Sequence, residues 1–321
     1  MFIAQAFKFK HDSWRYLVGT FIIFIIGWQL LGAIPLTVVS FMKAGNLSDF
    51  MIASESAFAS LFPPKSNLYF FLMLLTFIGG FISLLIVIKF IHNQTFTQLT
   101  TSRKKIDWGR FFFGFGLIAA FTIVTTVLDF YYNPENYIVQ FDLIPFLIMF
   151  AIAIVLIPIQ TSFEEYFFRG YLMQGIGVIA KNKWVPLIIT SVIFGGLHFF
   201  NPEVDKIGNI AMVFYIGTGF FLGIITLMDE GMELALGFHA GTNLIIALLV
   251  TTDWTVFQTN SILLDLTEPG TGIEVVLPVF IIYPILLGIM AWRYKWTNWK
   301  EKLFGKVIPP LETSVLEEKV D

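Results

Sequence analysis

Long apolar runs separated by short polar connections recur along the chain, from near the N-terminus almost to the C-terminus. Each run is close to the length of about 20 residues that a helix needs to cross a bilayer. The runs are continuously apolar and lack the alternation of membrane β-strands, so helices are expected. The expected spans are residues 16–40, 68–91, 111–131, 143–163, 184–200, 207–228, 232–250 and 275–293. The pattern predicts an all-α, polytopic membrane protein with about eight transmembrane helices.

The composition agrees with a membrane protein. Hydrophobic residue types make up 56% of the 321 residues and charged types 13%, which excludes an ordinary soluble domain. We expect one membrane domain over residues 1–300, with the lipid bilayer as its partner, and a flexible cytoplasmic tail over 301–321. The net charge of −3 indicates no nucleic-acid partner. Because the chain has no cysteine, disulfides, thiolate nucleophiles and thiolate metal ligands are excluded.

The basic residues gather on alternate connections between the expected spans. Cytoplasmic connections of membrane proteins carry an excess of Lys and Arg. Seventeen of the 20 Lys and Arg fall on one side, among them Arg169, Lys181 and Lys183 after the fourth span. This asymmetry predicts that both termini are cytoplasmic.

A first group of polar residues follows the fourth apolar run. Glu165 and Arg169 are four residues apart, so they can form an ion pair on one face of a helix. Glu164 is then turned away by about 100° and is free for another role. A helix end at the membrane surface with an ordinary surface ion pair is an equally good interpretation of this group alone.

A second group lies late in the fifth span, where Phe194 and His198 share a helical face. Gly195 and Gly196 between them would let another helix come close. A lone histidine near a span end is more often a hydrogen-bonded interfacial residue than a catalytic one. By itself, His198 therefore indicates little.

A third group lies inside the seventh span, where His239 and Asn243 occupy one face on consecutive turns. Gly237 and Gly241 have the spacing of small residues at a helix–helix contact. Simple hydrogen bonding between helices is the alternative interpretation. It is harder to sustain here, because both polar residues lie within one apolar segment, where polar groups are costly.

The three groups together supply the parts that peptide hydrolysis requires. A carboxylate in a partly apolar pocket can act as a general base towards water, and His or Asn donors can stabilise a tetrahedral oxyanion. The same Glu164, His198 and His239 could instead bind a divalent metal such as zinc that activates the water. The residues alone leave these two possibilities open.

With these motifs in order, the sequence resembles the type II CAAX prenyl endopeptidase family, also called CPBP intramembrane metalloproteases or the Abi family. Its signature is EExxxR, FxxxH and HxxxN, found here as Glu164-Glu165…Arg169, Phe194…His198 and His239…Asn243. The resemblance implies an eight-helix membrane protease with its core at about 143–250. It implies that Glu164 activates water, that His198, His239 and Asn243 support the oxyanion or a metal, and that Glu165 and Arg169 orient them.

The resemblance also implies a membrane-associated protein or peptide substrate, CAAX-like or simply hydrophobic, and a bacterial cytoplasmic membrane as the location. Two other functions stay open: a proton- or cation-coupled transporter, in which the same ionisable residues form a path, and a non-catalytic scaffold or immunity protein of the same family.

One geometric difficulty follows from the expected spans. Glu164 would lie at the cytoplasmic end of the fourth span, whereas His198 would lie about 20 Å along the fifth. A tilt, a kink near Pro158, or a helix that continues past Arg169 into a wet cavity would bring them to one depth.

Overall fold

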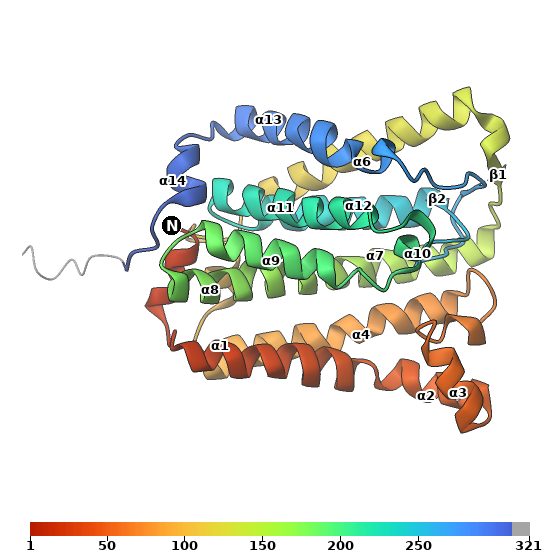
Figure 1. Ribbon diagram of the computed structural model, residues 1–321, viewed down its shortest axis with the longest axis horizontal. Helices are drawn as coiled ribbons and strands as arrows, with labels where there is room; N and C mark the ends of the chain where they lie inside the picture. Colours follow the sequence, from red (N-terminus) through yellow and green to blue (C-terminus); the bar gives the residue numbers. More distant parts are fainter. Residues whose placement is uncertain (310–321) are drawn as a thin grey trace, which may run out of the picture.

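A computed structural model describes residues 1–309 as a bundle of helices that lie roughly along one axis (Figure 1). Within these residues, five continuous helical segments are long and apolar enough to cross a membrane, and three apolar helices are shorter. The long segments are α1–η2–α2 (Ser13–Ala44), α4–η4 (Asn67–Ile91), α6 (Trp108–Tyr132), α7–η6–α8 (Leu143–Ala180) and α11 (Ala211–Asp229). The shorter ones are α9 (Trp184–Gly196), α12 (Glu233–Leu249) and η8–α13 (Pro278–Tyr294).

These eight segments correspond one to one with the eight expected spans, and the helical fold class is confirmed. The number of segments that cross the bilayer completely stays a prediction, because α9, α12 and α13 are short for a span. α9 ends at Gly196, before the expected boundary at residue 200, and α11 begins at Ala211 rather than at 207. Residues 202–207 form a separate short helix, α10 (Pro202–Ile207).

The expected end of the fourth span at residue 163 is wrong. The helix does not end there but runs on to Ala180, for a total length of 38 residues. It consists of α7 (Leu143–Glu165), the π-helical segment η6 (Tyr166–Leu172) and α8 (Met173–Ala180). A π-helical turn inside an α-helix re-aims the side chains around it and is frequent at functional sites. Arg169 therefore lies inside the helix, not in a polar connection, and is fully buried. Its assignment to a cytoplasmic connection is corrected accordingly.

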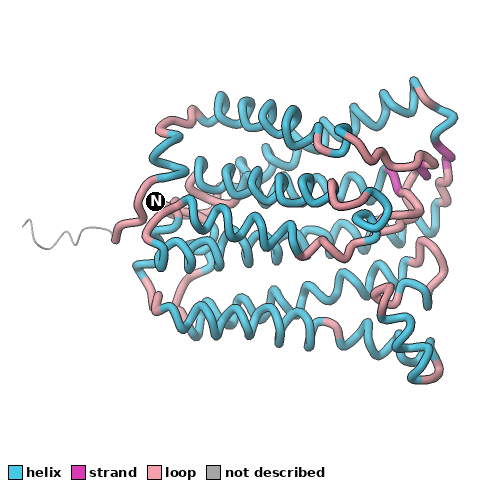
Figure 2. The backbone as a smooth tube through the Cα atoms, in the orientation of Figure 1, coloured by secondary structure: helices cyan, strands magenta, loops and turns pink. Residues whose placement is uncertain are grey.

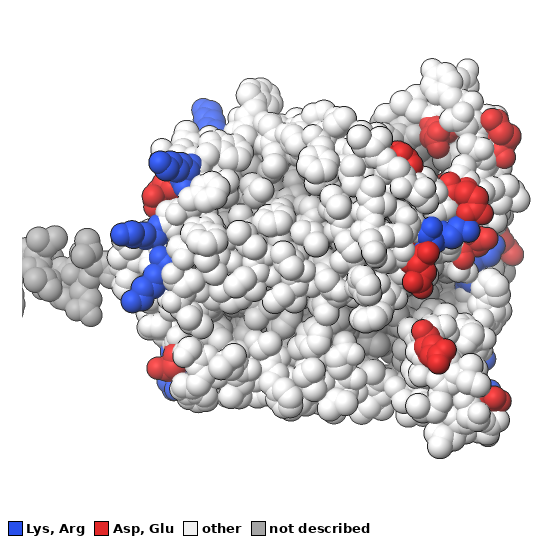
Figure 3. Space-filling view, in the orientation of Figure 1, with Lys and Arg blue, Asp and Glu red and all other residues white. Residues whose placement is uncertain are grey.

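Both the N-terminus and the end of the described chain lie at the same end of the bundle (Figure 1). Lys and Arg gather at this end, while Asp and Glu dominate the other, and the face between them shows a broad band without charged side chains (Figure 3). This arrangement is that of a protein with a basic and an acidic membrane surface. The cytoplasmic side of the basic end stays a prediction.

A small sheet and short helices close the acidic end (Figure 2). The strands β1 (Tyr137–Val139), β2 (Val250–Thr251) and β3 (Leu263–Asp265) form a sheet of order β1-β3-β2, in which β1 pairs antiparallel and β2 parallel to β3. These strands belong to the polar connections, where backbone groups can pair outside the apolar band. The remaining short elements are η1 (Ile3–Lys8), α3 (Leu47–Ser54), η3 (Ala59–Leu61), α5 (Phe96–Thr100), η5 (Pro134–Asn136), η7 (Ile273–Val275) and α14 (Trp299–Phe304).

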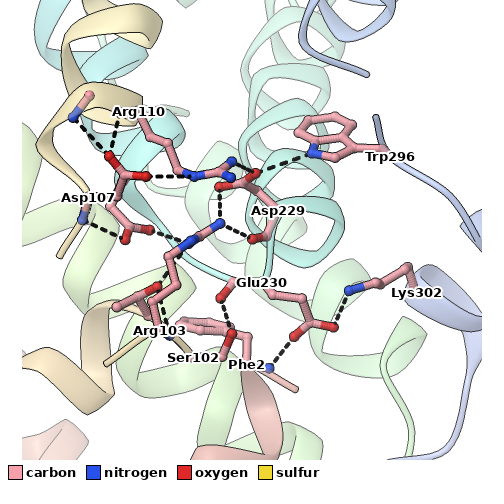
Figure 4. Close-up of polar contacts among 12 residues, drawn as sticks. Phe2, Ser102, Arg103, Asp107, Arg110, Asp229, Glu230, Trp296 and Lys302 are labelled. Atoms are coloured by element: carbon pink, nitrogen blue, oxygen red, sulfur yellow. Dashed lines mark hydrogen bonds and ion pairs between the residues drawn. The ribbon is translucent and has the colours of Figure 1, made fainter. Parts of the chain in front are cut away.

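An ionic network ties the connections together at the basic end (Figure 4). Arg103 donates to Asp229 at 2.9 Å and to Glu233 at 3.1 Å, and Arg110 also pairs with Asp229. The neighbouring Glu230 accepts from Lys302 at 2.6 Å and from the backbone N–H of Phe2. The start of the chain, the 101–107 connection and α14 are thus held to the turn between α11 and α12.

The expected tail begins within this ordered region. Residues 301–304 belong to α14, and Val307 is buried with its N–H donated to the carbonyl of Lys181. The expectation of flexibility for residues 310–321 lies outside the described residues.

Glycines set the closest helix contact, between α12 and α6. A Cβ added at Gly237 would lie 1.9 Å from the carbonyl oxygen of Phe111, and one at Gly241 would lie 2.9 Å from that of Phe115. The small residues let the two backbones touch, as their spacing predicts. The face of α12 opposite this contact is therefore fixed in place, and it carries His239 and Asn243.

Candidate active site

Glu165 and Arg169 form the predicted ion pair, with Arg169 donating to the Oε1 atom of Glu165 at 2.9 Å. Both side chains are fully buried, with 0% exposure, so they are not a surface pair. Arg169 also donates to the carbonyl oxygen of Gly219 on α11 at 3.2 Å, and its guanidinium lies 4.2 Å from the ring centre of Phe194. The pair joins three helices at the centre of the bundle.

His239 lies between the two glutamates. Its Nδ1 atom is 2.8 Å from the Oε1 atom of Glu165, and its Nε2 atom is 3.5 Å from the Oε2 atom of Glu164. An ionised carboxylate can only accept a hydrogen bond, so the Nδ1 atom of His239 carries a proton and its N–H donates a hydrogen bond to Glu165. The Nε2 atom of His239 is thereby aimed at Glu164.

Glu164 faces a second set of polar groups through Gln160, one turn earlier on α7. The side-chain amide of Gln160 donates to the Oε1 atom of Glu164 at 2.7 Å. The amide of Asn243 on α12 donates in turn to the Oε1 atom of Gln160 at 3.2 Å. Glu164 and Asn243 are therefore connected, although they do not hydrogen-bond to each other in the described structure.

His198 occupies the turn directly after α9. Its Nδ1 atom is 2.8 Å from the carbonyl oxygen of Phe194, and its ring stacks on Tyr215 of α11 with centroids 4.4 Å apart. Phe194 contacts the rings of both histidines, at 5.0 Å from His198 and 6.1 Å from His239. Among residues 1–309, no hydrogen bond or ion pair joins His198 to Glu164 or His239; Phe194 is the link between them.

The continuous helix over 143–180 removes the difficulty of depth. Glu164 lies about 24 Å from the end of α8 at Ala180, and His198 about 21 Å from the start of α9 at Trp184, at a rise of 1.5 Å per residue. The short connection 181–183 places these two helix ends together. Continuation of the fourth helix past Arg169, one of the three possibilities raised by the sequence, is therefore the solution.

The exposure of the side chains separates the two glutamates. Glu164 and His239 keep 12% and 10% of their side-chain surface, whereas Glu165 and Arg169 keep none. Glu164 therefore keeps some surface that a small reactant could contact, whereas Glu165 keeps none. The two glutamates, adjacent in sequence, are suited to different tasks.

A metal centre is not assembled by these residues. Within the described part of the chain, no group of three or more His, Asp or Glu side chains is placed to hold a metal ion. Glu164 and His239 are close to each other, but His198 is turned onto Tyr215. The candidate ligands Glu164, His198 and His239 do not converge, and no step below is routed through a metal.

Two site residues escaped the sequence analysis. Gln160 is 4% exposed and contacts both Glu164 and Asn243. Its position four residues before Glu164 was a usable signal, because the two share one face of an otherwise apolar helix. Tyr215 gave no such signal, because its stacking on His198 depends on how α9 and α11 pack.

Comparison with known proteins bears out the resemblance to the family. Residues 143–245, which contain all three motifs, match the family described as type II CAAX prenyl endopeptidase Rce1-like. The chain is also 29% identical over 295 residues to the uncharacterized protein YyaK of Bacillus subtilis. The matched residues make up 91% of this chain and 96% of that protein. No solved structure matches the chain significantly. The resemblance found in the sequence is confirmed, and it is to a family of proteases.

Proposed function

We propose that this chain, whose residues 143–245 match the type II CAAX prenyl endopeptidases, is itself an intramembrane endopeptidase. It would hydrolyse a peptide bond of a membrane-associated protein or hydrophobic peptide, CAAX-like in class. The observation that carries the proposal is the contact of Glu164 with His239, 3.5 Å apart and slightly exposed within an apolar helix bundle. Ionisable side chains are costly in such surroundings and mark functional sites, and a hydrolytic site would account for this carboxylate and imidazole.

In the proposed reaction, Glu164 acts as the general base. It takes a proton from a water molecule as the water oxygen attacks the carbonyl carbon of the substrate peptide bond. The carbonyl oxygen becomes an oxyanion. When the tetrahedral intermediate collapses, the C–N bond breaks and Glu164 returns the proton to the leaving nitrogen, which leaves a carboxylic acid and an amine.

The oxyanion needs hydrogen-bond donors, and the site offers them on two sides. The amide of Asn243 donates whatever the protonation state of its neighbours. The Nδ1 atoms of His198 and His239 are already engaged with Phe194 and Glu165. In the proposed reaction their Nε2 atoms are the nitrogens left for the oxyanion, and each donates when its imidazole is protonated. Of the two, the Nε2 atom of His239 is the one aimed at Glu164.

The buried pair beneath the site would act by positioning. Glu165 fixes the ring of His239 through Nδ1, and Arg169 compensates the charge of Glu165. The ring of Phe194 covers the guanidinium and separates the two histidines. Each of these residues touches a proposed reacting group or its direct partner, which is the arrangement that preorganised sites use.

The two alternative functions make different predictions. A proton- or cation-coupled transporter would depend on an ion gradient and would tolerate Glu164→Asp, because a path needs only an ionisable group. A scaffold or immunity protein would keep its function in Glu164→Gln. A base that must reach one water atom tolerates neither change.

The test is cleavage of a panel of farnesylated CAAX peptides and unmodified hydrophobic peptides by purified protein in detergent. We expect Glu164→Gln and His239→Ala to lose at least 100-fold in kcat while keeping the thermal unfolding profile of the unaltered protein. Gln174→Met serves as a matched control, because Gln174 is a buried glutamine on the same long helix, about 21 Å from Gln160.

Unchanged cleavage in folded Glu164→Gln would contradict the assignment of the base. Absence of cleavage by the unaltered protein, with every peptide of the panel, would contradict the proposed activity towards this substrate class.

A further inference from the structure

Asn243 can stabilise an oxyanion only if its amide nitrogen, and not its carbonyl oxygen, is presented to the site. An amide side chain can be rotated by half a turn with little change in shape, so its orientation must be set by its neighbours. Asn243 lies on α12 and Glu164 on α7, and no hydrogen bond joins them in the described structure. The group that sets the orientation must lie between them.

Gln160 occupies this position and is almost completely buried. Its two polar ends have different partners, with Glu164 at 2.7 Å on one side and Asn243 at 3.2 Å on the other. An ionised carboxylate accepts hydrogen bonds and cannot donate. Therefore the nitrogen of Gln160 must face Glu164, and its oxygen must face Asn243.

The orientation is passed on to Asn243. Because the oxygen of Gln160 can only accept, Asn243 must offer it an N–H group. The Asn243 amide nitrogen is thus turned towards Gln160, and its second N–H is left for another acceptor. With Glu164 ionised, as its proposed role as base requires, the direction of each hydrogen bond in the sequence Glu164–Gln160–Asn243 is fixed.

We infer that Gln160 is a positioning residue that couples the two halves of the active site, holding Glu164 as base and orienting Asn243 as an oxyanion donor. This inference rests on the proposed protease function and deepens it. Gln160 touches neither water nor substrate in this scheme; it acts through its two neighbours. It lies outside the three motifs, so only its contacts in the structure reveal this role.

The test uses the peptide of the panel that the unaltered protein cleaves fastest. Gln160→Met keeps the length of the side chain and removes both hydrogen bonds, so kcat should fall by about 10- to 100-fold. KM should change less than about threefold, because the substrate contacts remain. Gln174→Met, the same change at a buried site far from Glu164, should leave kcat within about twofold.

A kinetic double-mutant cycle separates positioning from mere destabilisation. In the Asn243→Ala background there is no amide left to orient, so Gln160→Met should cost clearly less in kcat than it does in the unaltered protein. If Gln160→Met does not fold, Gln160→Asn replaces it in the cycle. It retains a buried amide but is one methylene too short to reach both partners.

Independent, multiplicative losses in the cycle, or a kcat for Gln160→Met equal to that of Gln174→Met, would overturn the inference while leaving the protease function intact. If the unaltered protein cleaves no peptide, the failure belongs to the proposed function, and the inference falls with it.

Discussion

Arg169 shows what a permanently charged side chain requires at the centre of a membrane helix. It is fully buried, and its partners are the carboxylate of Glu165, the carbonyl of Gly219 and the ring of Phe194. The Nε atom of Arg169 and the Oε2 atom of Glu165 have no hydrogen-bond partner in the described structure. Buried ion pairs contribute little net stability, which agrees with the proposed role of this pair in positioning His239.

Removing one member of the Glu165–Arg169 pair should lower the free energy of unfolding much more than removing both. Arg169→Met leaves the buried carboxylate of Glu165 without its cationic partner and with only His239 as a hydrogen-bond donor, so we expect a loss of about 3–5 kcal/mol in the free energy of unfolding. The double variant Glu165→Gln/Arg169→Met should recover part of this loss. Thermal unfolding in detergent measures both. Lys206→Met, which breaks an exposed pair with Glu268, is the control and should show no measurable change. Equal unfolding temperatures for Arg169→Met and Lys206→Met would contradict this account.

His92 predicts a pH dependence of stability outside the membrane-spanning segments. It is buried between the carbonyl of Lys10 and the hydroxyl of Tyr171, and burial lowers its pKa below the ordinary 6.5. The folded state therefore favours the neutral ring. The contribution of the neutral ring to the free energy of unfolding is complete above pH 6.5 and is lost as the pH falls below that value. The loss amounts to about 1.4 kcal/mol for each unit by which folding lowers the pKa of His92.

We therefore expect the unfolding temperature of the unaltered protein to drop as the pH falls below 6.5. His92→Gln removes the titrating group and should flatten this part of the profile. A profile of the same steepness in both proteins would show that another group is responsible.

At the scale of single residues, the sequence predicted the contact within the fourth helix in detail, but it did not predict the geometry of most contacts between helices. The Glu165–Arg169 pair follows from a spacing of four residues. The contact of Glu164 with His239 bridges 75 positions of chain, and only their combined chemistry and the resemblance to a family joined the two motifs. Gln160 and Tyr215 lie outside those motifs, and so their roles depend on helix packing that periodicity does not report.

At the scale of elements, the fourth helix carries the main error of the sequence analysis. Hydropathy registers the cost of Glu164, Glu165 and Arg169, but not that these charges are paired and turned inward. The helix was therefore ended at residue 163, although it continues to Ala180. The other seven helices were located within a few residues, because their apolar runs have no such interruption.

The adjacent glycines after Phe194 offer a direct test of how α9 packs against α11. A Cβ at Gly195 would lie 2.4 Å from the side chain and 2.8 Å from the backbone N of Ile216 on α11, whereas one at Gly196 meets nothing within 4 Å. Gly195→Ala should therefore push α9 away from α11 and cost about 1–3 kcal/mol of stability. Gly196→Ala should be neutral or stabilising by up to about 1 kcal/mol.

Thermal unfolding in detergent again distinguishes the two variants, and peptide cleavage gives a second measurement. Because His198 follows three residues after Gly195, cleavage should fall in Gly195→Ala and persist in Gly196→Ala. If the effects were equal, the close approach of the two helices would not be what positions this turn.

At the scale of the whole molecule, the distribution of charge predicts the orientation in the membrane. The absence of cysteine makes this testable with single introduced thiols against an unreactive background. Ser56, after α3, and Lys300, in α14, are exposed and lie at opposite ends of the bundle (Figure 1). In intact cells, a membrane-impermeant maleimide should label Ser56→Cys at once and Lys300→Cys only after permeabilisation. Labelling in the reverse order would invert the predicted topology.

The buried pair in the fourth helix also bears on how the protein is made. When this helix leaves the ribosome, Gly219 and His239, the later partners of Arg169 and Glu165, are still 50 and 74 residues away in the chain. At roughly 5–20 residues per second, His239 follows Glu165 by several seconds. Only the contact between Glu165 and Arg169 is available from the start, since it lies within one helix. This helix can therefore enter the bilayer with its charges already neutralising each other, and its contacts with Gly219 and His239 form afterwards.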